Sequence, residues 1–348
     1  MRVAVIGASG YTGAEMLRLW AGHPQLKVAG VYAATSAGQG LADHYPSLDR
    51  AGQQRLQAVD IAQIKEVADW AVLGLPHGSS ATLADELLDA GLGVVDLSAS
   101  FRLPVALYNK LYGEHPCPER LKEAVYGLPE LHRSALPGAR LIAGPGCFPT
   151  GVTLACAPFV AAGLVANSTL IADCKTGVTG AGAKASLTTH FCQVADTVMP
   201  YKVEGHRHGP EIAHNLGALS DMPVTVRFTP HLLPIRRGIL STCYLPLNAS
   251  QNTADLRRVL ASFYAAEPFV HVLPEGVQPN LARVAGTNEV EVQVVADAAA
   301  GADYIKIRTD ALFNQRDLNI LAVHEGMVHV ATSLNGQHQP ICTFLAKG

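Results

Sequence analysis

The feature that most constrains the fold is a glycine-rich turn close to the N-terminus. Residues 2–6 form a short apolar, β-branched run that predicts a buried strand. Residues 14–20 carry apolar residues at helical spacing, which predicts a helix. Between them lies Gly7-Ala-Ser-Gly10-Tyr-Thr-Gly13. Glycines at these positions allow a tight turn and a close backbone approach to a pyrophosphate, while the helix N-terminus supplies free N–H groups. The pattern predicts a dinucleotide-binding strand–turn–helix unit; the alternative is a tight turn that holds no ligand.

Strands and helices then alternate over the first 145 residues. A helical stretch at 79–91 separates two of the apolar, strand-like runs, and the last run ends in glycines. Such alternation indicates βαβ units around a parallel sheet, which is an α/β Rossmann dinucleotide-binding domain. The further strands are predicted at 26–34, 70–76, 93–98 and 140–146.

The order of elements loosens after residue 147. An amphipathic helix is predicted at 150–164 and a further helix at 253–268, and strand periodicity marks three longer segments. At roughly 100–200 residues per domain, 348 residues suggest a second domain. We expect it to be α+β with a mostly antiparallel sheet. The strand segments are 168–185, which runs into a glycine-rich loop, 223–247 and 288–297.

The end of the second predicted strand bears on the type of dinucleotide. An acidic residue in this place holds the ribose 2′-OH in NAD-binding proteins. Here the segment is Tyr32-Ala-Ala-Thr35-Ser36-Ala-Gly38, and the first acid downstream is Asp43. Hydroxyl and backbone donors around Ser36 can bind a 2′-phosphate instead, so NADP(H) is favoured over NAD(H).

A second glycine-rich turn carries the best candidate nucleophile. Gly144-Pro-Gly146-Cys147 follows one predicted strand and precedes a predicted helix. Backbone N–H groups and the dipole at a helix N-terminus lower the pKa of a thiol, and the thiolate is the reactive form. We therefore expect Cys147 to act as a covalent nucleophile; the alternative is a buried structural cysteine.

A nucleophilic cysteine needs an acid–base partner, and one short segment supplies candidates. His206, His208 and Glu211 lie within six residues, and Pro210 suits the first turn of a helix. Either histidine can exchange protons with the thiol or with the product oxygen, and Glu211 can orient His208 or hold a substrate group. The alternative is a pair of surface histidines at a helix end. No third ligand accompanies them, so a metal site is not expected.

Composition argues against several other classes of protein. The net charge is −3 without any Lys/Arg run, whereas a nucleic-acid surface needs a basic stripe. No apolar run reaches the roughly 18 residues of a membrane span, and the N-terminus lacks the pattern of a signal peptide. The seven cysteines include no CxxC pair, which favours reduced thiols in the cytoplasm over disulfides or zinc. We expect no metal, no nucleic acid and no membrane partner.

Together, nine short segments resemble N-acetyl-gamma-glutamyl-phosphate reductase, the NADPH enzyme of arginine biosynthesis, which is related in fold and chemistry to aspartate-semialdehyde dehydrogenase. They occur in the family's order over about residues 1–290. The segments are GASGYTGAE (7–15), LPHG (75–78), DLSASFRL (96–103), VYGLPE (125–130), GPGCFPT (144–150), TGVTGAGAK (176–184), GHRHGPEI (205–212), FTPHLLPIRRGIL (228–240) and VAGTN (284–288).

The resemblance implies a role for many individual residues. Cys147 matches the catalytic thiol, and His206 and His208 match the acid–base segment, with either histidine as the acting one. Substrate-binding candidates are Arg102, Glu211, Arg236 and Arg237, one of the last two being alternatively a solvated surface arginine. Cofactor-binding candidates are Gly7, Ser9, Gly10, Tyr11, Thr12, Gly13, Ser36, Pro76, His77, Ser98 and Gly180.

The resemblance also implies an architecture. An NADP-binding domain would span 1–146 and be completed by a C-terminal helix at about 316–348. A catalytic and oligomerisation domain would span 147–315, in a homodimer or homotetramer. Residues 309–315 depart from the family's pattern before the last helix, which leaves room for a different acyl-phosphate substrate.

The expected reaction follows from these parts. The Cys147 thiolate attacks the acyl phosphate of N-acetyl-L-glutamyl 5-phosphate, phosphate leaves, and the thioester accepts hydride from NADPH to give N-acetyl-L-glutamate 5-semialdehyde. Two alternatives remain open: a related reductase of aspartyl or aminoadipyl phosphate, and a non-catalytic regulator that binds NADP. A zinc-dependent dehydrogenase would require ligands that the sequence does not offer.

Overall fold

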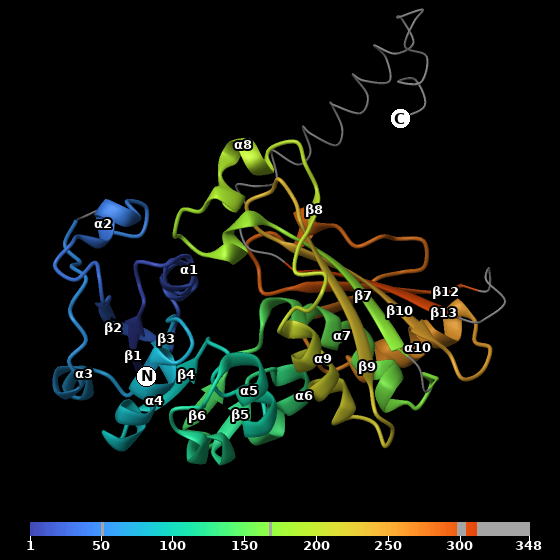
Figure 1. Ribbon diagram of the computed structural model, residues 1–348, viewed down its shortest axis with the longest axis horizontal. Coiled ribbons are helices and arrows are strands. Elements are labelled where there is room, and N and C mark those ends of the chain that lie inside the picture. The colour runs from blue at the N-terminus through green and yellow to red at the C-terminus, as the bar shows by residue number, and fades with distance from the viewer. Residues whose placement is uncertain (50–51, 167–168, 298–303, 312–348) are drawn as a thin grey trace, which may run out of the picture. The chain divides into compact units, whose positions relative to one another are not determined.

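The computed structural model describes residues 1–49, 52–166, 169–297 and 304–311 (Figure 1). The predicted C-terminal helix at about 316–348 lies outside the described residues. The described chain forms two compact units. The first unit contains Met1–Thr150, Ala181–Lys184 and Arg207–Asn215; the second contains Gly151–Gly180, Ala185–His206 and the described residues from Leu216 onwards.

The first unit is built on a six-stranded sheet in the order β2-β1-β3-β4-β6-β5. Every neighbouring pair is parallel, which confirms the predicted Rossmann-type sheet. The chain proceeds outwards from β1 in both directions. Open α/β sheets bind ligands beyond the carboxyl ends of the strands at such a reversal. The strands are β1 (Arg2–Ile6), β2 (Lys27–Tyr32), β3 (Trp70–Leu73), β4 (Gly93–Asp96), β5 (Ala124–Tyr126) and β6 (Leu141–Ala143).

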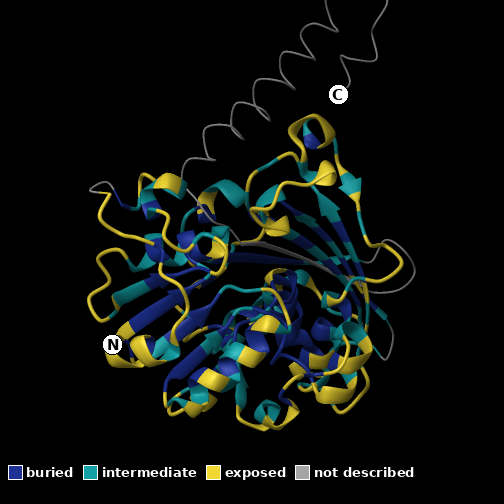
Figure 2. Cartoon of the chain, turned by 60° about the vertical axis from the view of Figure 1, so that its left-hand side comes forward, coloured by how far each residue is buried: buried dark blue, intermediate teal, exposed yellow. Residues whose placement is uncertain are grey.

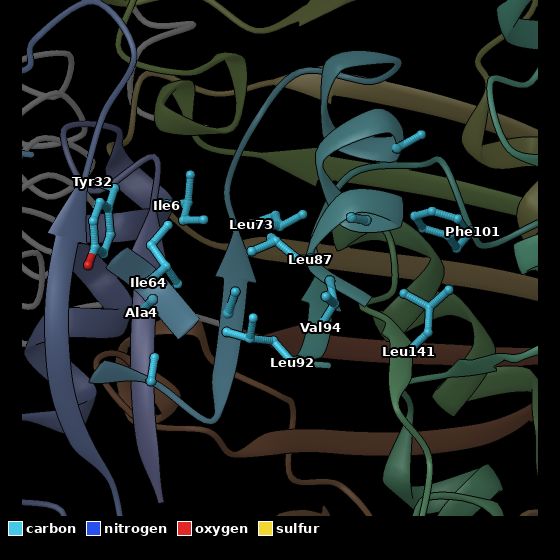
Figure 3. Packing of buried hydrophobic residues seen from close by; sticks show 14 of the residues in the cluster. Ala4, Ile6, Tyr32, Ile64, Leu73, Leu87, Leu92, Val94, Phe101 and Leu141 are labelled. Atoms are coloured by element: carbon cyan, nitrogen blue, oxygen red, sulfur yellow. The ribbon is translucent and has the colours of Figure 1, made fainter. Parts of the chain in front are cut away.

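Helices cover both faces of this sheet because successive strand residues point to opposite sides and are apolar on both. Ile6 of β1 packs in one buried cluster with Leu73 and Leu87 (Figure 3), whereas the adjacent Val5 joins Leu17 in another. The helices of this unit are α1 (Tyr11–Trp20), α2 (Leu41–His44), α3 (Ile61–Val67), α4 (Ser79–Asp89), α5 (Val105–Tyr112), η1 (Pro118–Lys122), α6 (Pro129–His132), η2 (Arg133–Ala135) and most of α9 (His208–Gly217).

The second unit is built on a seven-stranded sheet in the order β11-β12-β13-β10-β7-β9-β8. The pairs β12–β13, β13–β10, β10–β7 and β9–β8 are antiparallel, but β11–β12 and β7–β9 are parallel. The sheet is therefore mixed, whereas the sequence did not indicate the two parallel pairs. Its strands are β7 (Thr169–Thr176), β8 (Met199–Pro200), β9 (Thr225–Leu232), β10 (Ile239–Pro246), β11 (Val270–Val272), β12 (Val290–Asp297) and β13 (Tyr304–Ala311).

Long connections explain the parallel pairs. Parallel neighbours need a crossover, and the chain between β7 and β9 supplies one. It contains α9 and three short helices, η3 (Val178–Ala181), η4 (Leu187–Thr189) and α8 (Phe191–Val194). These helices are not recognisable from the alternation of apolar residues. The unit also contains α10 (Thr253–Phe263) and α11 (Leu281–Val284).

Helix α7 (Cys147–Ala161) is apolar on all sides rather than amphipathic, because it is a core helix that is buried along most of its length (Figure 2). Pro158 lies inside it and has no N–H to donate to the carbonyl of Leu154. The hydroxyl of Tyr264 donates to that carbonyl instead, at 2.7 Å. A side chain of the second unit thus satisfies the one backbone acceptor that the proline leaves open. Within the described residues, no helix has both the length and the apolarity of a membrane span.

Candidate active site

Two of the glycines in the first turn are dictated by packing. Gly7 adopts φ +92°, and a Cβ built on it would lie 2.4 Å from the carbonyl oxygen of Gly74, which follows β3. A Cβ on Gly13 would lie 2.4 Å from the carbonyl oxygen of Gly7. Any larger residue at either place would force β1, β3 and α1 apart.

Gly10 is different, because packing does not require a glycine there. Its backbone is extended, and a Cβ would approach only the carbonyl oxygen of Gly7, at 3.4 Å. It is the N-cap of α1, and no side chain caps that N-terminus. Free N–H groups beside an open backbone fit a pyrophosphate. Tyr11 and exposed Thr12 begin the helix, and the Ser9 carbonyl accepts a hydrogen bond from Tyr45.

The turn after β2 holds Ser36, half-buried, among exposed neighbours. The side chain of Arg55 donates to the carbonyl of Gly38 at 3.1 Å, and Gly38 N donates to the carbonyl of Leu56 at 2.7 Å. These bonds place an exposed guanidinium beside the segment in which a 2′-phosphate is expected. The sequence prediction missed Arg55 because it lies 17 residues beyond Gly38 and only the fold brings the two together.

The loops after β3 and β4 hold Pro76, His77 and Ser98. His77 is exposed, and its Nδ1 accepts a hydrogen bond from Ala99 N at 3.1 Å. Desolvation lowers the pKa of His77, and the charges of Arg207 and Arg102 lower it further, so the ring is neutral at pH 7. The Pro76 carbonyl accepts bonds from Ser79 and Ser80 at the start of α4.

Ser98 is buried in the protein. Its hydroxyl donates to Asp96 Oδ2 at 2.6 Å, and the hydroxyl of Ser80 donates to Oδ1 of the same carboxylate at 2.5 Å. Asp96 and these serines are buried. Ser98 therefore shapes the loop after β4 instead of offering a free hydroxyl.

Cys147 is the first residue of α7 and directly follows the carboxyl-end loop of β6. The carbonyl of Gly146 accepts hydrogen bonds from the N–H and the hydroxyl of Thr150, which closes the first helical turn. Gly146 N donates to Glu211 Oε1 at 2.9 Å. Hydrogen bonds to the carbonyl and from the N–H of Gly146 therefore fix the turn that presents the thiol.

Glu211 is the centre of a buried network. Its Oε1 also accepts from the hydroxyl of Tyr126 at 2.8 Å, and its Oε2 faces Arg102 Nη1 at 3.4 Å. Arg102 in turn donates to the carbonyls of Gly144, at 2.6 Å, and Leu97, at 2.7 Å. Glu211 is 1% exposed and Arg102 8%, so both are engaged with the protein on every side. Glu211 thus holds the turn that presents the Cys147 thiol, and Arg102 pairs with Glu211 and joins two loops.

The pKa of Cys147 corrects a sequence prediction. Desolvation by the surrounding protein raises the pKa of the thiol; the N–H of Phe148 and the charge of Arg102 act in the opposite direction, and the charge of Glu211 adds to the rise. The helix N-terminus thus acts as expected but is outweighed. Cys147 is nevertheless exposed, because solvent access and the density of the surrounding protein are separate properties of the site. The resting residue is a thiol, reachable from solvent.

The two histidines belong to different units. A Cβ on Gly146 would lie 2.9 Å from Nε2 of His208, and the His208 ring meets the Phe148 ring edge-on at 5.8 Å. His208 therefore lies against both neighbours of Cys147 within the first unit. His206 belongs to the second unit, where the centre of its ring lies 5.8 Å from that of Tyr201 and 5.2 Å from that of Phe228.

Arg236, Arg237 and Gly180 lie together in the second unit. Thr179 N donates to the carbonyl of Arg236 at 2.9 Å, and a Cβ on Gly177 would lie 2.6 Å from Arg237 N. Arg236 and Gly180 are exposed and Arg237 is half-buried. In the described part of the chain, no group of three or more His, Cys, Asp or Glu residues could hold a metal ion.

Two family models match consecutive parts of the chain. Residues 2–139 match the family model of the semialdehyde dehydrogenase NAD binding domain, and residues 147–310 match that of the semialdehyde dehydrogenase dimerisation domain. The N-acetyl-gamma-glutamyl-phosphate reductases of Geobacter metallireducens and Magnetococcus marinus are each 43% identical to this chain over 303 residues. These residues make up 86% of this chain and 88% and 87% of the relatives.

Solved structures share the fold at lower sequence identity. Aspartate semialdehyde dehydrogenase II from Vibrio cholerae has a TM-score of 0.66 and 19% identity, covering 89% of this chain and 92% of that one. Aspartate semialdehyde dehydrogenase with NADP from Candida albicans has a TM-score of 0.63 and 17% identity, covering 89% and 93%. With identities above 40% to relatives over most of its length, this chain belongs to the N-acetyl-gamma-glutamyl-phosphate reductase family.

Proposed function

We propose that this chain reduces N-acetyl-L-glutamyl 5-phosphate to N-acetyl-L-glutamate 5-semialdehyde and phosphate, a step of arginine biosynthesis, with NADP(H) as cofactor. The observation that carries the proposal is the geometry around Cys147. An exposed thiol begins a helix, its turn is held by Glu211, and His208 lies against both of its neighbours.

Cys147 and His208 perform the covalent chemistry in this proposal. Because the pKa of the thiol is raised, the proton must be removed as the sulfur attacks, and His208 accepts it. The S–C bond forms, the C–O bond to phosphate breaks, and phosphate leaves with the electron pair. Backbone N–H groups at the start of α7 stabilise the oxygen that becomes negative.

The second half of the reaction regenerates the thiol. NADPH, when bound, supplies the hydride that converts the Cys147 thioester to the aldehyde oxidation level. The C–S bond then breaks, the aldehyde leaves, and His208 returns its proton to the sulfur. Glu211, Arg102 and Tyr126 are positioning residues, because they hold the turn at Gly146 from inside the protein.

The first unit supplies the residues that would hold the cofactor. The N–H groups of the first turn of α1 suit the pyrophosphate, with Ser9, Tyr11 and Thr12 alongside. Ser36 and Arg55 suit the 2′-phosphate, since an arginine at this place accommodates NADP and no acid is present to hold a free 2′-OH. Pro76 and His77 border the same edge of the sheet.

The assembly and the location complete the proposal. A homodimer or homotetramer through residues 147–315 is supported by the match of 147–310 to a dimerisation domain. In that assembly the cofactor domain spans residues 1–146, and Arg236 and Arg237 bind the substrate. The cytoplasm is supported by the described cysteines, all of which are free thiols.

The test is the reverse reaction with a panel of aldehydes. Purified protein is given phosphate, NADP⁺ or NAD⁺, and one of N-acetylglutamate semialdehyde, aspartate semialdehyde or aminoadipate semialdehyde, and reduced cofactor is followed by absorbance. We expect phosphate-dependent reduction of NADP⁺ with the first aldehyde at least tenfold faster than with the others. Preference for another aldehyde would replace the substrate, and cofactor binding without turnover on any of them would favour a regulator.

A further inference from the structure

Arg207 is held in an unusual way for an exposed cation. Its guanidinium carbon lies 4.6 Å from the centre of the Tyr112 ring. That ring is stacked on Tyr108 at 5.0 Å and is met edge-on by His77, also at 5.0 Å. Arg207 is exposed, and among the described residues no carboxylate forms an ion pair with it.

The contrast with Arg102 shows what this arrangement leaves available. Arg102 is buried, and its Nε and both terminal nitrogens donate to Gly144, Glu211 and Leu97. A contact through the face of a ring fixes the plane of a guanidinium but uses none of its N–H donors. Arg207 therefore presents an oriented fork of donors that no described carboxylate accepts, which is the geometry that binds two phosphate oxygens at once.

The surroundings favour an anion. Arg207 and Arg102 both lower the pKa of His77, so two positive charges act on one neutral ring. The nearby acids are neutralised or bonded internally: Glu211 faces Arg102, and Asp96 accepts from serine hydroxyls. Arg207 also directly precedes His208, which lies against Gly146 and Phe148. The free positive charge is thus next in sequence to the proposed acid–base residue.

We propose that Arg207, oriented by Tyr112, binds the phosphoryl group of the acyl phosphate, and inorganic phosphate in the reverse direction. This inference rests on the proposed function. As the Cys147 sulfur forms its bond to the carbonyl carbon, the C–O bond breaks and the leaving phosphate gains the electron pair. A guanidinium that already holds two of its outer oxygens stabilises the added charge.

The main experiment compares Arg207→Met with Arg207→Lys and with Arg258→Met. Arg258 is an exposed arginine of α10 in the second unit, paired with Asp255. Inorganic phosphate is titrated in the reverse reaction, and NADPH binding is titrated by fluorescence. We expect the KM for phosphate to rise roughly 10–100-fold in Arg207→Met, less in Arg207→Lys, and not at all in Arg258→Met, with the Kd of NADPH unchanged.

Two further variants test the ring. Tyr112→Phe keeps the aromatic face and should leave the KM for phosphate within about twofold of wild type, whereas Tyr112→Leu should raise it severalfold without lowering kcat to the same extent. Loss of kcat alone would show a merely structural role for Tyr112. An increase in the Kd of NADPH with an unchanged KM for phosphate would assign Arg207 to the dinucleotide and overturn the proposal.

A second readout does not depend on turnover. Inorganic phosphate should slow the alkylation of Cys147 by neutral iodoacetamide in the wild type and in Arg258→Met, but not in Arg207→Met. If no aldehyde supports turnover, the proposed function fails while this protection still tests the anion site. Equal protection in all variants would overturn the inference whatever the substrate is.

Discussion

The N-termini of α1 and α7 are built alike but differ in the charge and the burial of the groups beside them. Both helices follow a strand of the same parallel sheet, and both begin directly after a glycine, Gly10 or Gly146. At α1 no side chain caps the N-terminus and its first turn holds no acid. At α7 the N–H of Gly146 donates to Glu211, whose charge opposes a thiolate.

The difference shows that a helix N-terminus does not by itself decide the charge of the group placed on it. Free N–H groups at α1 are left for a ligand that brings its own negative charge. At α7 the N–H groups of the helix N-terminus favour the thiolate, but desolvation outweighs them. The pKa of Cys147 is therefore raised and the resting group is neutral. In the proposed mechanism a neutral thiol needs a base, and His208, which lies against Gly146 and Phe148, is the candidate.

The largest effect is expected from the nucleophile itself. Cys147→Ser should lower kcat by about 10⁴-fold or more, since the covalent step is lost, while the Kd of NADPH stays within about twofold of wild type. Cys192→Ser is the matched control, because Cys192 is also exposed. If steady-state assays of Cys147→Ser give turnover near the wild-type rate, the thiol at the N-terminus of α7 is not the nucleophile.

The base should have the next largest effect. His208→Asn should lower kcat by roughly 10²–10⁴-fold, because the raised pKa of Cys147 makes proton removal part of the attack. His206→Asn removes a ring that packs on Tyr201 and Phe228 and should retain most of the chemistry. Single-turnover rates separate the two; a larger loss in His206→Asn would reverse the assignment.

Two glycines of the α1 turn separate packing from ligand binding. Gly13→Ala brings a Cβ to 2.4 Å from a backbone oxygen and should lower the free energy of unfolding by about 1–3 kcal/mol. Gly10→Ala meets nothing closer than 3.4 Å and should leave stability nearly unchanged while weakening NADPH binding roughly tenfold. Denaturant titrations and fluorescence titrations measure the two properties. Equal effects of both substitutions would show that Gly10 has no ligand role.

Arg55 provides a finer test of the cofactor end. Arg55→Gln should raise the Kd of NADPH by about tenfold and leave that of NADH unchanged, because only NADPH carries the 2′-phosphate. The ratio of the two Kd values is the measurement. An equal change for both cofactors would place Arg55 elsewhere than at the 2′-phosphate.

The smallest effect on function is expected from the charge beside the thiol. Glu211→Gln removes a negative charge that raises the pKa of Cys147, so the pKa should fall and the pH profile of alkylation by iodoacetamide should shift to lower pH. At neutral pH the rate should rise a few-fold, since more thiolate is present. Unfolding is followed in parallel, because breaking the buried pair with Arg102 costs about 3–5 kcal/mol. A shift to higher pH would contradict the role given to Glu211.

Much of the fold could be predicted from local sequence. The strand at 2–6 is β1, and the segment 223–247 contains β9 and β10 on either side of the loop that holds Arg236. Short strands such as β5 (Ala124–Tyr126) have too few residues for a recognisable period. The parallel pairing of β7 with β9 depends on a long connection, which periodicity does not describe.

The parts of the site that escaped prediction all depend on tertiary contacts. His206 and His208 are two residues apart, yet they belong to different units. The partners of Glu211 in the buried network, Tyr126 and Arg102, are 85 and 109 residues away in the sequence. Arg55 reaches the turn after β2 through the same kind of distant contact.

The most direct measurement is to trap the acyl-enzyme. The protein is mixed with N-acetyl-L-glutamyl 5-phosphate without NADPH, quenched in acid, digested and analysed by mass spectrometry. We expect an N-acetylglutamyl adduct on the peptide that contains Cys147, formed at the burst rate and much more slowly in His208→Asn. A turning-over enzyme that shows no adduct, or an adduct on another residue, would contradict the role of Cys147 as the nucleophile.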